Sequence, residues 1–469
     1  MMKGPTAGAG VIRQWLSTIV VPAVALVVTM VVISLLAGGS SLSGESIREF
    51  FTIAPDFLAS RGMFQGGQQP CLPDKNAQSG TMNSTEASVG ASRYVDRKIP
   101  EPTDFQTDAQ GSTCDLYRGE WVFDSSAGPL YTHNSCPVII ETQNCQRNGR
   151  PDKGYENWRW KPEQCILPRF DARKFLELMR GKTLAFVGDS LARNQMESLL
   201  CILWQVETPE NQSTSRMQKW IFASSSTTII RIWSSWLVHK STEAVEFAPE
   251  GLDKVFLDIP DENFMEFLPS FDVIVLSSGH WFTRRSAYIL NGKVVGGQLW
   301  WPRQEGNMQM NNVDSFSISV ETCLTAVATN PKFKGIAVVR TYSPDHYERG
   351  AWNTNGSCTG KVKPLHEVVR NAYTDTMYEK QVASFRRSVI KSGEHGGAKL
   401  KLMDITEPFA LRVDGHLGPY TSVDPNKKTQ RGPDGKPPRQ DCLHWCMPGP
   451  VDTWNEMLFE TIRRELLVV

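Results

Sequence analysis

The chain has 469 residues, a length that suits about three ordinary domains or one large α/β domain with appended segments. Lysine and arginine together number 50, as do aspartate and glutamate, so the formal net charge is zero. This balance argues against a general nucleic-acid-binding protein, which needs an excess of basic residues. Hydrophobic residues make up 40% of the chain and aromatic residues 10%, which excludes wholesale disorder.

An apolar segment near the N-terminus predicts a membrane anchor. Residues 15–36 are predominantly apolar, and a helix of about 20 residues crosses a bilayer. Lys3 and Arg13 precede this segment, so residues 1–14 are predicted to form a cytosolic tail and the rest of the chain to lie on the other side. A cleaved signal peptide and a buried core helix are the alternatives.

The remainder of the chain fits the secretory pathway. Residues 37–113 are rich in Ser, Gly, Gln, Pro and Thr and are predicted to form a flexible lumenal stem. All 10 cysteines follow the apolar segment, and glycosylation sequons occur at Asn83, Asn211 and Asn355. Nearly all of the 14 tryptophans lie in residues 114–469, which we therefore expect to form one large lumenal domain.

Strand and helix patterns alternate along this domain. Short apolar runs bounded by turn residues predict strands, and apolar residues at helical spacing predict helices. In chain order we expect a helix at 172–179, a strand at 183–187, a helix at 191–204, strands at 228–233 and 273–276, a helix at 320–328, a strand at 335–340, a helix at 372–390, a strand at 399–404 and a helix at 451–466. This alternation favours a parallel α/β sheet, whose ligands bind at the carboxyl ends of the strands.

The first candidate motif is Gly188-Asp189-Ser190, between a predicted strand and a predicted helix. A serine in this position lies beside the free N–H groups and the positive dipole end of the helix, where an oxyanion is stabilised. The alternative is that Ser190 or Asp189 only caps the helix.

The second candidate motif combines Asp441 and His444. A carboxylate three residues before a histidine can accept the imidazole N–H and fix the tautomer, which suits a general base for a serine. Prolines 437, 438, 448 and 450 predict that the segment is a loop, and Cys442 and Cys446 flank the histidine. A metal site formed by Cys442, His444 and Cys446 is the alternative. It is disfavoured because the lumen oxidises cysteine and no fourth ligand is near in sequence, so we expect no metal.

Further candidates follow other predicted strands. Gly279 could let the backbone approach a substrate, and His280 and Trp281 could line its pocket; a tight structural turn is the alternative. Asp345 and His346 are interpreted as a pocket wall or a structural pair. Sugar stacking and core packing are both open for Trp300, Trp301 and Trp352.

Taken in order, the motifs resemble the plant trichome-birefringence-like family, with its TBL and PC-esterase-type domains. The resemblance covers residues 114–469 and rests on Cys114–Val122, Asn144–Asp152, Trp158–Pro162, Gly188–Gln195, Gly279–Trp281 and Asp441–Cys446. It implies an α/β fold similar to that of SGNH/GDSL esterases, stapled by disulfides. Many members read Asp-Ala/Gly-His-Pro where this chain has Asp414-Gly-His-Leu417.

The resemblance also implies an activity. Characterised members are Golgi polysaccharide O-acetyltransferases acting on xylan, xyloglucan or mannan. Ser190 then matches the nucleophile that forms an acetyl-serine, His444 the base and Asp441 its orienting acid. Asp189, Arg193 and Asn194 match positions beside the nucleophile that would organise the substrate pocket.

The partners implied are an acetyl donor, a wall polysaccharide and the Golgi membrane. Other proteins of wall synthesis are further candidates. We expect no nucleic-acid partner and no bound cofactor. The implied location is a single-pass type II Golgi membrane protein with a lumenal catalytic domain. Two other functions stay open: an acetyl esterase that uses the same triad, and a non-enzymatic protein that bridges pectin and other wall polysaccharides.

The resemblance further implies a set of disulfides, which spacing alone does not choose. The implied pairs are Cys114–Cys165, Cys136–Cys201, Cys145–Cys446 and Cys358–Cys442. Cys71 and Cys323 are left over, and we expect no bond between them.

Overall fold

The structure is a computed structural model that describes residues 114–467, apart from residues 127, 246–247, 303–306, 396–397 and 433–434. The predicted tail, anchor and stem (residues 1–113), with Cys71 and Asn83, lie outside the described residues. Within the described part of the chain, no helix is long and apolar enough to cross a membrane.

A seven-stranded sheet forms the centre of the fold. Its strand order is β13 (Lys399–Met403), β12 (Ile336–Arg340), β9 (Val273–Ser277), β3 (Thr183–Gly188), β6 (Thr227–Trp233), β5 (Gln218–Phe222) and β4 (Glu210–Asn211). Strands β13 to β6 in this order are parallel, and β5 and β4 extend the β6 edge in antiparallel fashion. The predicted mostly parallel α/β sheet is confirmed.

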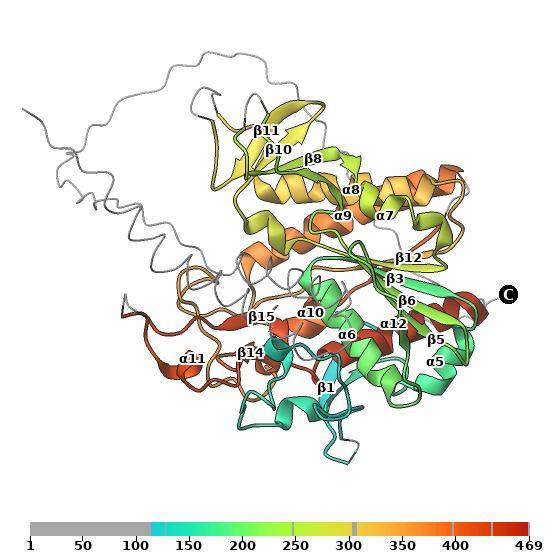
Figure 1. The fold of residues 1–469 in the computed structure, drawn as a ribbon, viewed down its shortest axis with the longest axis vertical. Helices are drawn as coiled ribbons and strands as arrows, with labels where there is room; N and C mark the ends of the chain where they lie inside the picture. Colours follow the sequence, from blue (N-terminus) through green and yellow to red (C-terminus); the bar gives the residue numbers. More distant parts are fainter. Residues whose placement is uncertain are drawn as a thin grey trace, which may run out of the picture. The chain divides into compact units, whose positions relative to one another are not determined.

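Helices cover both faces of this sheet because alternate residues of its strands point in opposite directions. Leu184 and Phe186 of β3 pack in one core cluster, and Ala185 and Val187 pack in the other. The first cluster is completed by α5 (Ala172–Leu178), α6 (Ser190–Trp204) and α12 (Val451–Leu467), and the second by α8 (Asn312–Thr329) and α9 (Ala372–His395). Figure 1 shows α8 and α9 on one side of the strands and α6 and α12 on the other.

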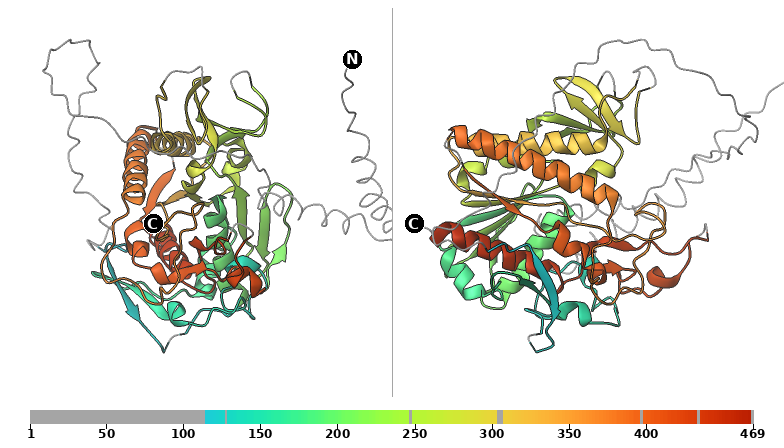
Figure 2. Two further views of the ribbon diagram at one scale, coloured as in Figure 1. Left: turned by 90° about the vertical axis from the view of Figure 1, so that its left-hand side faces the viewer. Right: turned by 180° about the vertical axis from the view of Figure 1, so that it is seen from behind.

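A second sheet, which was not predicted, packs beyond α8 (Figure 2). Its order is β11 (Lys293–Gln298), β10 (Ser286–Leu290), β8 (Asp253–Pro260) and β7 (Val238–Ser241). Asn291 and Gly292 join β10 to β11 with φ angles of 52° and 73°, the conformation of a tight hairpin turn. An Asn-Gly pair between β-prone residues is the signal that could have predicted this hairpin.

Two short antiparallel ribbons complete the strands: β1 (Gly119–Phe123) with β2 (Trp158–Pro162), and β14 (His416–Gly418) with β15 (Asp441–Trp445). The loop predicted around residues 441–446 is therefore wrong. The prolines that suggested it lie outside β15 and bound the strand, so they remove no ladder hydrogen bond from it. The remaining short helices are α7 (Glu262–Met265), α10 (Thr406–Ala410), α11 (Asn426–Thr429) and the 3-10 helices Glu141–Gln143, Gly154–Asn157, Leu268–Ser270, His280–Thr283 and Val413–Gly415.

Candidate active site

The candidate nucleophile Ser190 is the first residue of α6, directly after the central strand β3. Asp189 caps this helix, because its Oδ1 accepts the N–H of Leu191 at 2.9 Å. Gly188 is required by a close approach: a Cβ atom on it would lie 2.1 Å from the carbonyl oxygen of Ser277 on β9. The Ser190 hydroxyl is thus not needed as the cap and lies at the positive end of the helix dipole.

The structure brings Ser190, His444 and Asp441 together in a continuous chain of hydrogen bonds. His444 Nε2 lies 2.7 Å from Ser190 Oγ, and His444 Nδ1 lies 2.7 Å from Asp441 Oδ2. The other oxygen of Asp441 accepts the main-chain N–H groups of Leu443 and His444 at 3.1 and 2.9 Å. Because the carboxylate takes the proton on Nδ1, Nε2 is left as the acceptor that faces the serine hydroxyl.

The surroundings of Asp441 and His444 favour an ionised carboxylate and a basic imidazole. Burial alone would raise the pKa of Asp441, but the charge of His444 and hydrogen bonds from His444 and Leu443 hold that pKa well below its usual range. Burial alone would lower the pKa of His444, but the charge and hydrogen bond of Asp441 outweigh it, and the pKa of His444 is raised. His444 is therefore a stronger base than a free imidazole.

Arg193 lies on the same helix as the nucleophile. Its guanidinium is 3.9 Å from the carboxylate of Glu197. Burial raises the pKa of Glu197 to about 7, and the charge of Arg193 opposes that rise. The charge of Arg193 also opposes the rise in the pKa of His444. Arg193 therefore acts on the triad electrostatically, in keeping with its predicted place beside the nucleophile.

Asn194 lies one turn after Ser190 on α6. Its side chain is fully buried, and its Oδ1 accepts the N–H of Trp445 at 2.9 Å. Its Nδ2 donates to the carbonyl oxygen of the same residue at 3.3 Å. Both polar atoms of the amide are thus engaged with β15, so Asn194 ties the strand that carries His444 to the helix that begins at Ser190.

The Gly279-His280-Trp281 segment follows β9 at the same edge of the sheet. Gly279 has a φ of 135°, and a Cβ atom there would lie 2.7 Å from the Tyr342 ring. The His280 ring stacks on Tyr342 at 4.2 Å, and its Nε2–H donates to the Ser343 carbonyl oxygen at 2.9 Å. Burial lowers the pKa of His280 to about 3, so this imidazole stays neutral. His280 is accordingly a structural contact between two loops at the catalytic edge.

Trp281 belongs to a half-exposed aromatic group. Its ring lies 5.6 Å from that of Trp233, whose backbone pairs with Gly188 at the end of β3. The Arg284 guanidinium lies 4.4 Å from the Trp281 ring and 5.7 Å from that of Trp352. Trp233 and Trp352 are each 39% exposed, so this aromatic surface is open to a ligand.

Four disulfides are present among the described residues, and they are the pairs that the family resemblance implies: Cys114–Cys165, Cys136–Cys201, Cys145–Cys446 and Cys358–Cys442. The last two hold both sides of His444. Because Cys442 and Cys446 are oxidised, neither is a thiolate ligand, and the alternative metal site is wrong. No cluster of three or more His, Cys, Asp or Glu suited to a metal occurs in the part of the chain that the structure describes. Cys323 is a buried free thiol.

Arg340 was not identified from the sequence as a residue of the candidate site. It ends β12, is only 2% exposed, and donates to the carbonyl oxygen of Leu191 and to Gln195 Oε1, both at 3.1 Å. Burial raises the pKa of Asp189, and the charge of Arg340 opposes that rise. An arginine at the carboxyl end of a wholly apolar strand was the signal, because such a charge must find buried partners.

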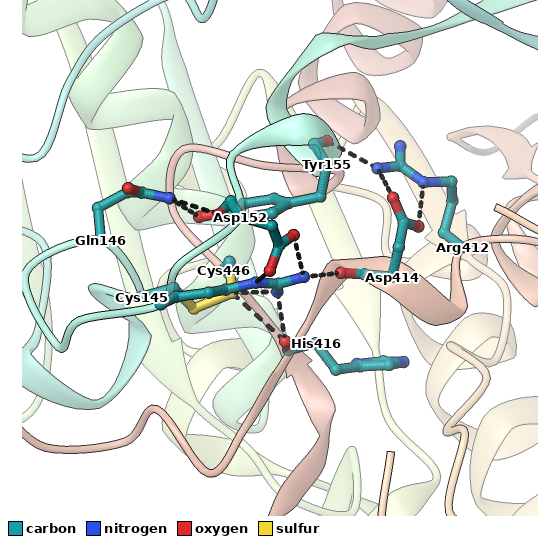
Figure 3. Close-up of polar contacts among 9 residues, drawn as sticks. Cys145, Gln146, Asp152, Tyr155, Arg412, Asp414, His416 and Cys446 are labelled. Carbon is teal, nitrogen blue, oxygen red and sulfur yellow. Dashed lines mark hydrogen bonds and ion pairs between the residues drawn. A yellow bond between two sulfur atoms is a disulfide. The ribbon is translucent and has the colours of Figure 1, made fainter. Parts of the chain in front are cut away.

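A second missed group supports β14. Arg150 is 6% exposed, forms two hydrogen bonds to Asp152, and donates to the main-chain carbonyl oxygens of His416 and Asp414 at 2.8 and 2.6 Å. Asp414 itself forms a fully buried ion pair with Arg412 (Figure 3). Leu417, the departure from the family pattern, is buried within β14 and belongs to a small core cluster with Cys145, Tyr155 and Cys446.

The chain was compared with known proteins. Residues 167–461 match the PC-Esterase family, described as a GDSL/SGNH-like acyl-esterase family found in Pmr5 and Cas1p, and residues 112–166 match the PMR5 N-terminal domain. Protein trichome birefringence-like 18 of Arabidopsis thaliana is 64% identical over 354 residues, 75% of this chain and 66% of that protein. The chain therefore spans slightly less than two thirds of that relative's length.

Two further relatives extend the comparison. Protein YLS7 of Arabidopsis thaliana is 58% identical over 398 residues, 84% of this chain and 79% of that protein. Xyloglucan O-acetyltransferase 1 of the same organism is 38% identical over 365 residues, 75% of this chain and 80% of that protein. A solved small COPII coat GTPase, SAR1 from Encephalitozoon cuniculi, matches with 9% identity over 63% of this chain and 89% of that chain, but its TM-score of 0.21 carries no argument.

Proposed function

We propose, because this chain belongs to the trichome birefringence-like PC-esterase family, that it is an O-acetyltransferase acting on a cell-wall polysaccharide. The observation that carries the proposal is the unbroken chain from Asp441 through His444 to Ser190, with 2.7 Å at each imidazole nitrogen. Relatives named xyloglucan O-acetyltransferases support a hemicellulose acceptor.

The geometry supports a double displacement. His444 Nε2 takes the proton of the Ser190 hydroxyl as Oγ attacks the carbonyl carbon of the acetyl donor. The tetrahedral intermediate collapses to an acetyl-serine, and the donor's leaving group takes the proton from His444. A sugar hydroxyl then gives its proton to His444 as its oxygen attacks the acetyl carbon. The bond from that carbon to Ser190 Oγ breaks, and His444 returns the proton to Oγ, which restores the serine and releases the acetylated sugar.

We further propose a lumenal catalytic domain on a type II Golgi anchor. The apolar segment 15–36, with Lys3 and Arg13 before it, supports the orientation. The disulfides of the described domain support an oxidising compartment.

The proposal is tested with the full-length protein, purified in detergent and given 4-nitrophenyl acetate as donor surrogate and unacetylated xylan, xyloglucan and pectin oligosaccharides. We expect acetylated xylan or xyloglucan fragments, ahead of pectin, by mass spectrometry. Release of free acetate alone, at a rate that the acceptors leave unchanged, would identify an esterase. Pectin binding that survives Ser190→Ala, without any acetyl transfer, would identify a bridging protein.

The aromatic surface gives a prediction about the acceptor. Trp233→Ala and Trp352→Ala should each raise the KM for the oligosaccharide about tenfold, because loss of one stacked sugar face costs about 1.4 kcal/mol. The KM for the donor surrogate and kcat should change little. Trp158→Ala is the matched control, since Trp158 packs on Phe123 in the separate β1–β2 ribbon. Equal effects of all three variants would contradict an acceptor site at this surface.

A further inference from the structure

The catalytic base lies on a strand that the central sheet does not hold. Among the described residues, β15, which carries Asp441 and His444, pairs with β14 alone, in a two-stranded ribbon separate from the seven-stranded sheet. A two-stranded ribbon is only marginally stable by itself. The 2.7 Å contact between His444 Nε2 and Ser190 Oγ therefore depends on contacts outside the sheet, both side-chain contacts and main-chain hydrogen bonds such as that from His346 N–H to the Cys442 carbonyl oxygen at 3.0 Å.

His416, on β14, makes the contact that reaches the base directly. Its Nδ1 lies 3.0 Å from the carbonyl oxygen of His444, and its ring stacks on that of Trp445 at 4.1 Å. The side chain is 4% exposed. Its other nitrogen, Nε2, lies 2.6 Å from Nδ1 of His346, whose Nε2 in turn lies 3.0 Å from the carbonyl oxygen of Ala410.

The protonation of the two rings follows from their partners. A carbonyl oxygen only accepts hydrogen bonds, so His416 must carry its proton on Nδ1 and His346 on Nε2. Burial lowers the pKa of His346 to about 4 and that of His416 well below its usual range, so both imidazoles are neutral at neutral pH. The facing atoms, His416 Nε2 and His346 Nδ1, then both lack a proton, so their 2.6 Å contact is not a hydrogen bond while the pair is neutral.

The charged and titratable groups facing the pair come from several elements. They are Glu348, Lys361, Asp414, Asp441 and His444, together with Arg150 at the His416 carbonyl oxygen. None of these accepts the His416 Nδ1–H, which goes to the His444 carbonyl oxygen.

His416 is itself held through its main chain. Arg150 donates to the carbonyl oxygens of both His416 and Asp414. Its guanidinium is held by an ion pair with Asp152 and lies 4.0 Å from the centre of the Tyr155 ring. Arg150 belongs to the segment that matches the PMR5 N-terminal domain, and so do Asp152 and Tyr155. This N-terminal segment therefore contacts β14, the partner strand of the catalytic base.

We propose that His416, held through its main chain by Arg150, is a positioning residue that fixes the main chain of His444 so that its imidazole meets Ser190. The inference rests on the proposed function for its choice of nucleophile and base. It predicts a loss of base-assisted reactivity at Ser190 without a loss of acceptor binding.

The test compares His416→Asn with His416→Gln in the full-length protein. An asparagine amide nitrogen can occupy the place of Nδ1 and still donate to the His444 carbonyl oxygen, whereas a glutamine amide nitrogen reaches the place of Nε2. The readout is the rate at which a fluorophosphonate labels Ser190, which needs an activated serine but no acetyl acceptor. Thermal unfolding of each variant is measured beside it.

We expect labelling of Ser190 in His416→Gln to slow by about 10- to 100-fold, the effect of a base displaced by up to about 1 Å. Labelling of Ser190 in His416→Asn should stay within about threefold of the wild-type rate. The acceptor KM should be unchanged in both. Equal labelling rates in the two variants, whether fast or slow, would overturn the proposal.

Two arms keep the outcomes distinct. If neither His416 variant folds, the test uses Arg150→Lys, which keeps the charge but loses the paired donors to Asp414 and His416. Labelling of Ser190 in this variant must slow at least about threefold. An unchanged rate would reject the positioning role of His416. Should wild type be labelled at Ser190 yet transfer no acetyl group, the proposed function fails while the positioning role of His416 is still measured.

Discussion

Ser190→Ala is expected to reduce acetyl transfer by at least about 10³-fold, because the variant cannot form an acetyl-serine. The fold should be kept, with a change in the free energy of unfolding of less than about 1 kcal/mol. The reason lies in the helix cap: Asp189 accepts the Leu191 N–H, so alanine at the first helical position removes no capping bond. Initial rates of transfer and urea unfolding monitored by circular dichroism check the two halves of this expectation.

His444→Ala should be about as severe, since members of a triad act as a unit. His239 provides a matched control, because its Nδ1 also meets a carboxylate, that of Glu262 at 2.9 Å, but on an exposed edge of the fold. His239→Ala should leave transfer unchanged. If Ser190→Ala retained full transfer, Ser190 would be an ordinary helix residue and the enzyme proposal would fail.

The five parallel strands of the central sheet could be predicted because its inner strands are apolar on both faces, whereas the more exposed antiparallel strands β5 and β4 were missed. Residues 183–187 and 273–276 are buried between two helical layers, which produces continuous apolar runs rather than alternation. The position of Ser190 followed from the same pattern, since a strand ends and a helix begins on either side of it. The family motifs then supplied the pairing of Ser190 with the distant Asp441 and His444.

Helix α8 shows one way in which apolar patterning falls short. The predicted helix begins at residue 320, but α8 begins at Asn312. Its first turns bury Ser315, Ser317 and Ser319, whose hydroxyls bond to Asn311, Ser384 and Phe316. Small polar residues can be buried when their hydroxyl groups hydrogen-bond to nearby oxygens, but they add nothing to the apolar pattern. The helix predicted from that pattern therefore begins too late in the sequence.

The second sheet was missed for a related reason. Strand β8 begins with Asp253 and Lys254, which read as surface residues, yet Lys254 is fully buried and its Nζ donates to the Thr242 carbonyl oxygen.

The contacts that Arg150 and His416 make around β14 and β15 were missed because these side chains bond to main-chain carbonyl oxygens. No pattern in the sequence around Arg150 or His416 indicates which distant carbonyl oxygen each side chain will bind.

Asp441→Asn is expected to lower transfer by roughly 10²- to 10⁴-fold and to change its pH dependence. An asparagine oxygen can still accept the main-chain N–H groups of Leu443 and His444, so the turn that carries the base should persist. Its amide nitrogen, however, would donate toward Nδ1 of His444. The imidazole would then carry its proton on Nε2, where it can no longer accept the proton of Ser190.

The sign of the pH effect follows from the pKa of His444. In the wild type the charge of Asp441 raises that pKa above its usual value, and transfer requires the neutral imidazole. The kcat/KM for transfer should therefore fall as the pH drops through the raised pKa. In Asp441→Asn the raising charge is gone, so the acid limb of kcat/KM should move to lower pH while the plateau falls. Profiles of kcat/KM against pH for the two proteins measure both effects, and an acid limb at the same pH in both would mean that Asp441 does not control the base.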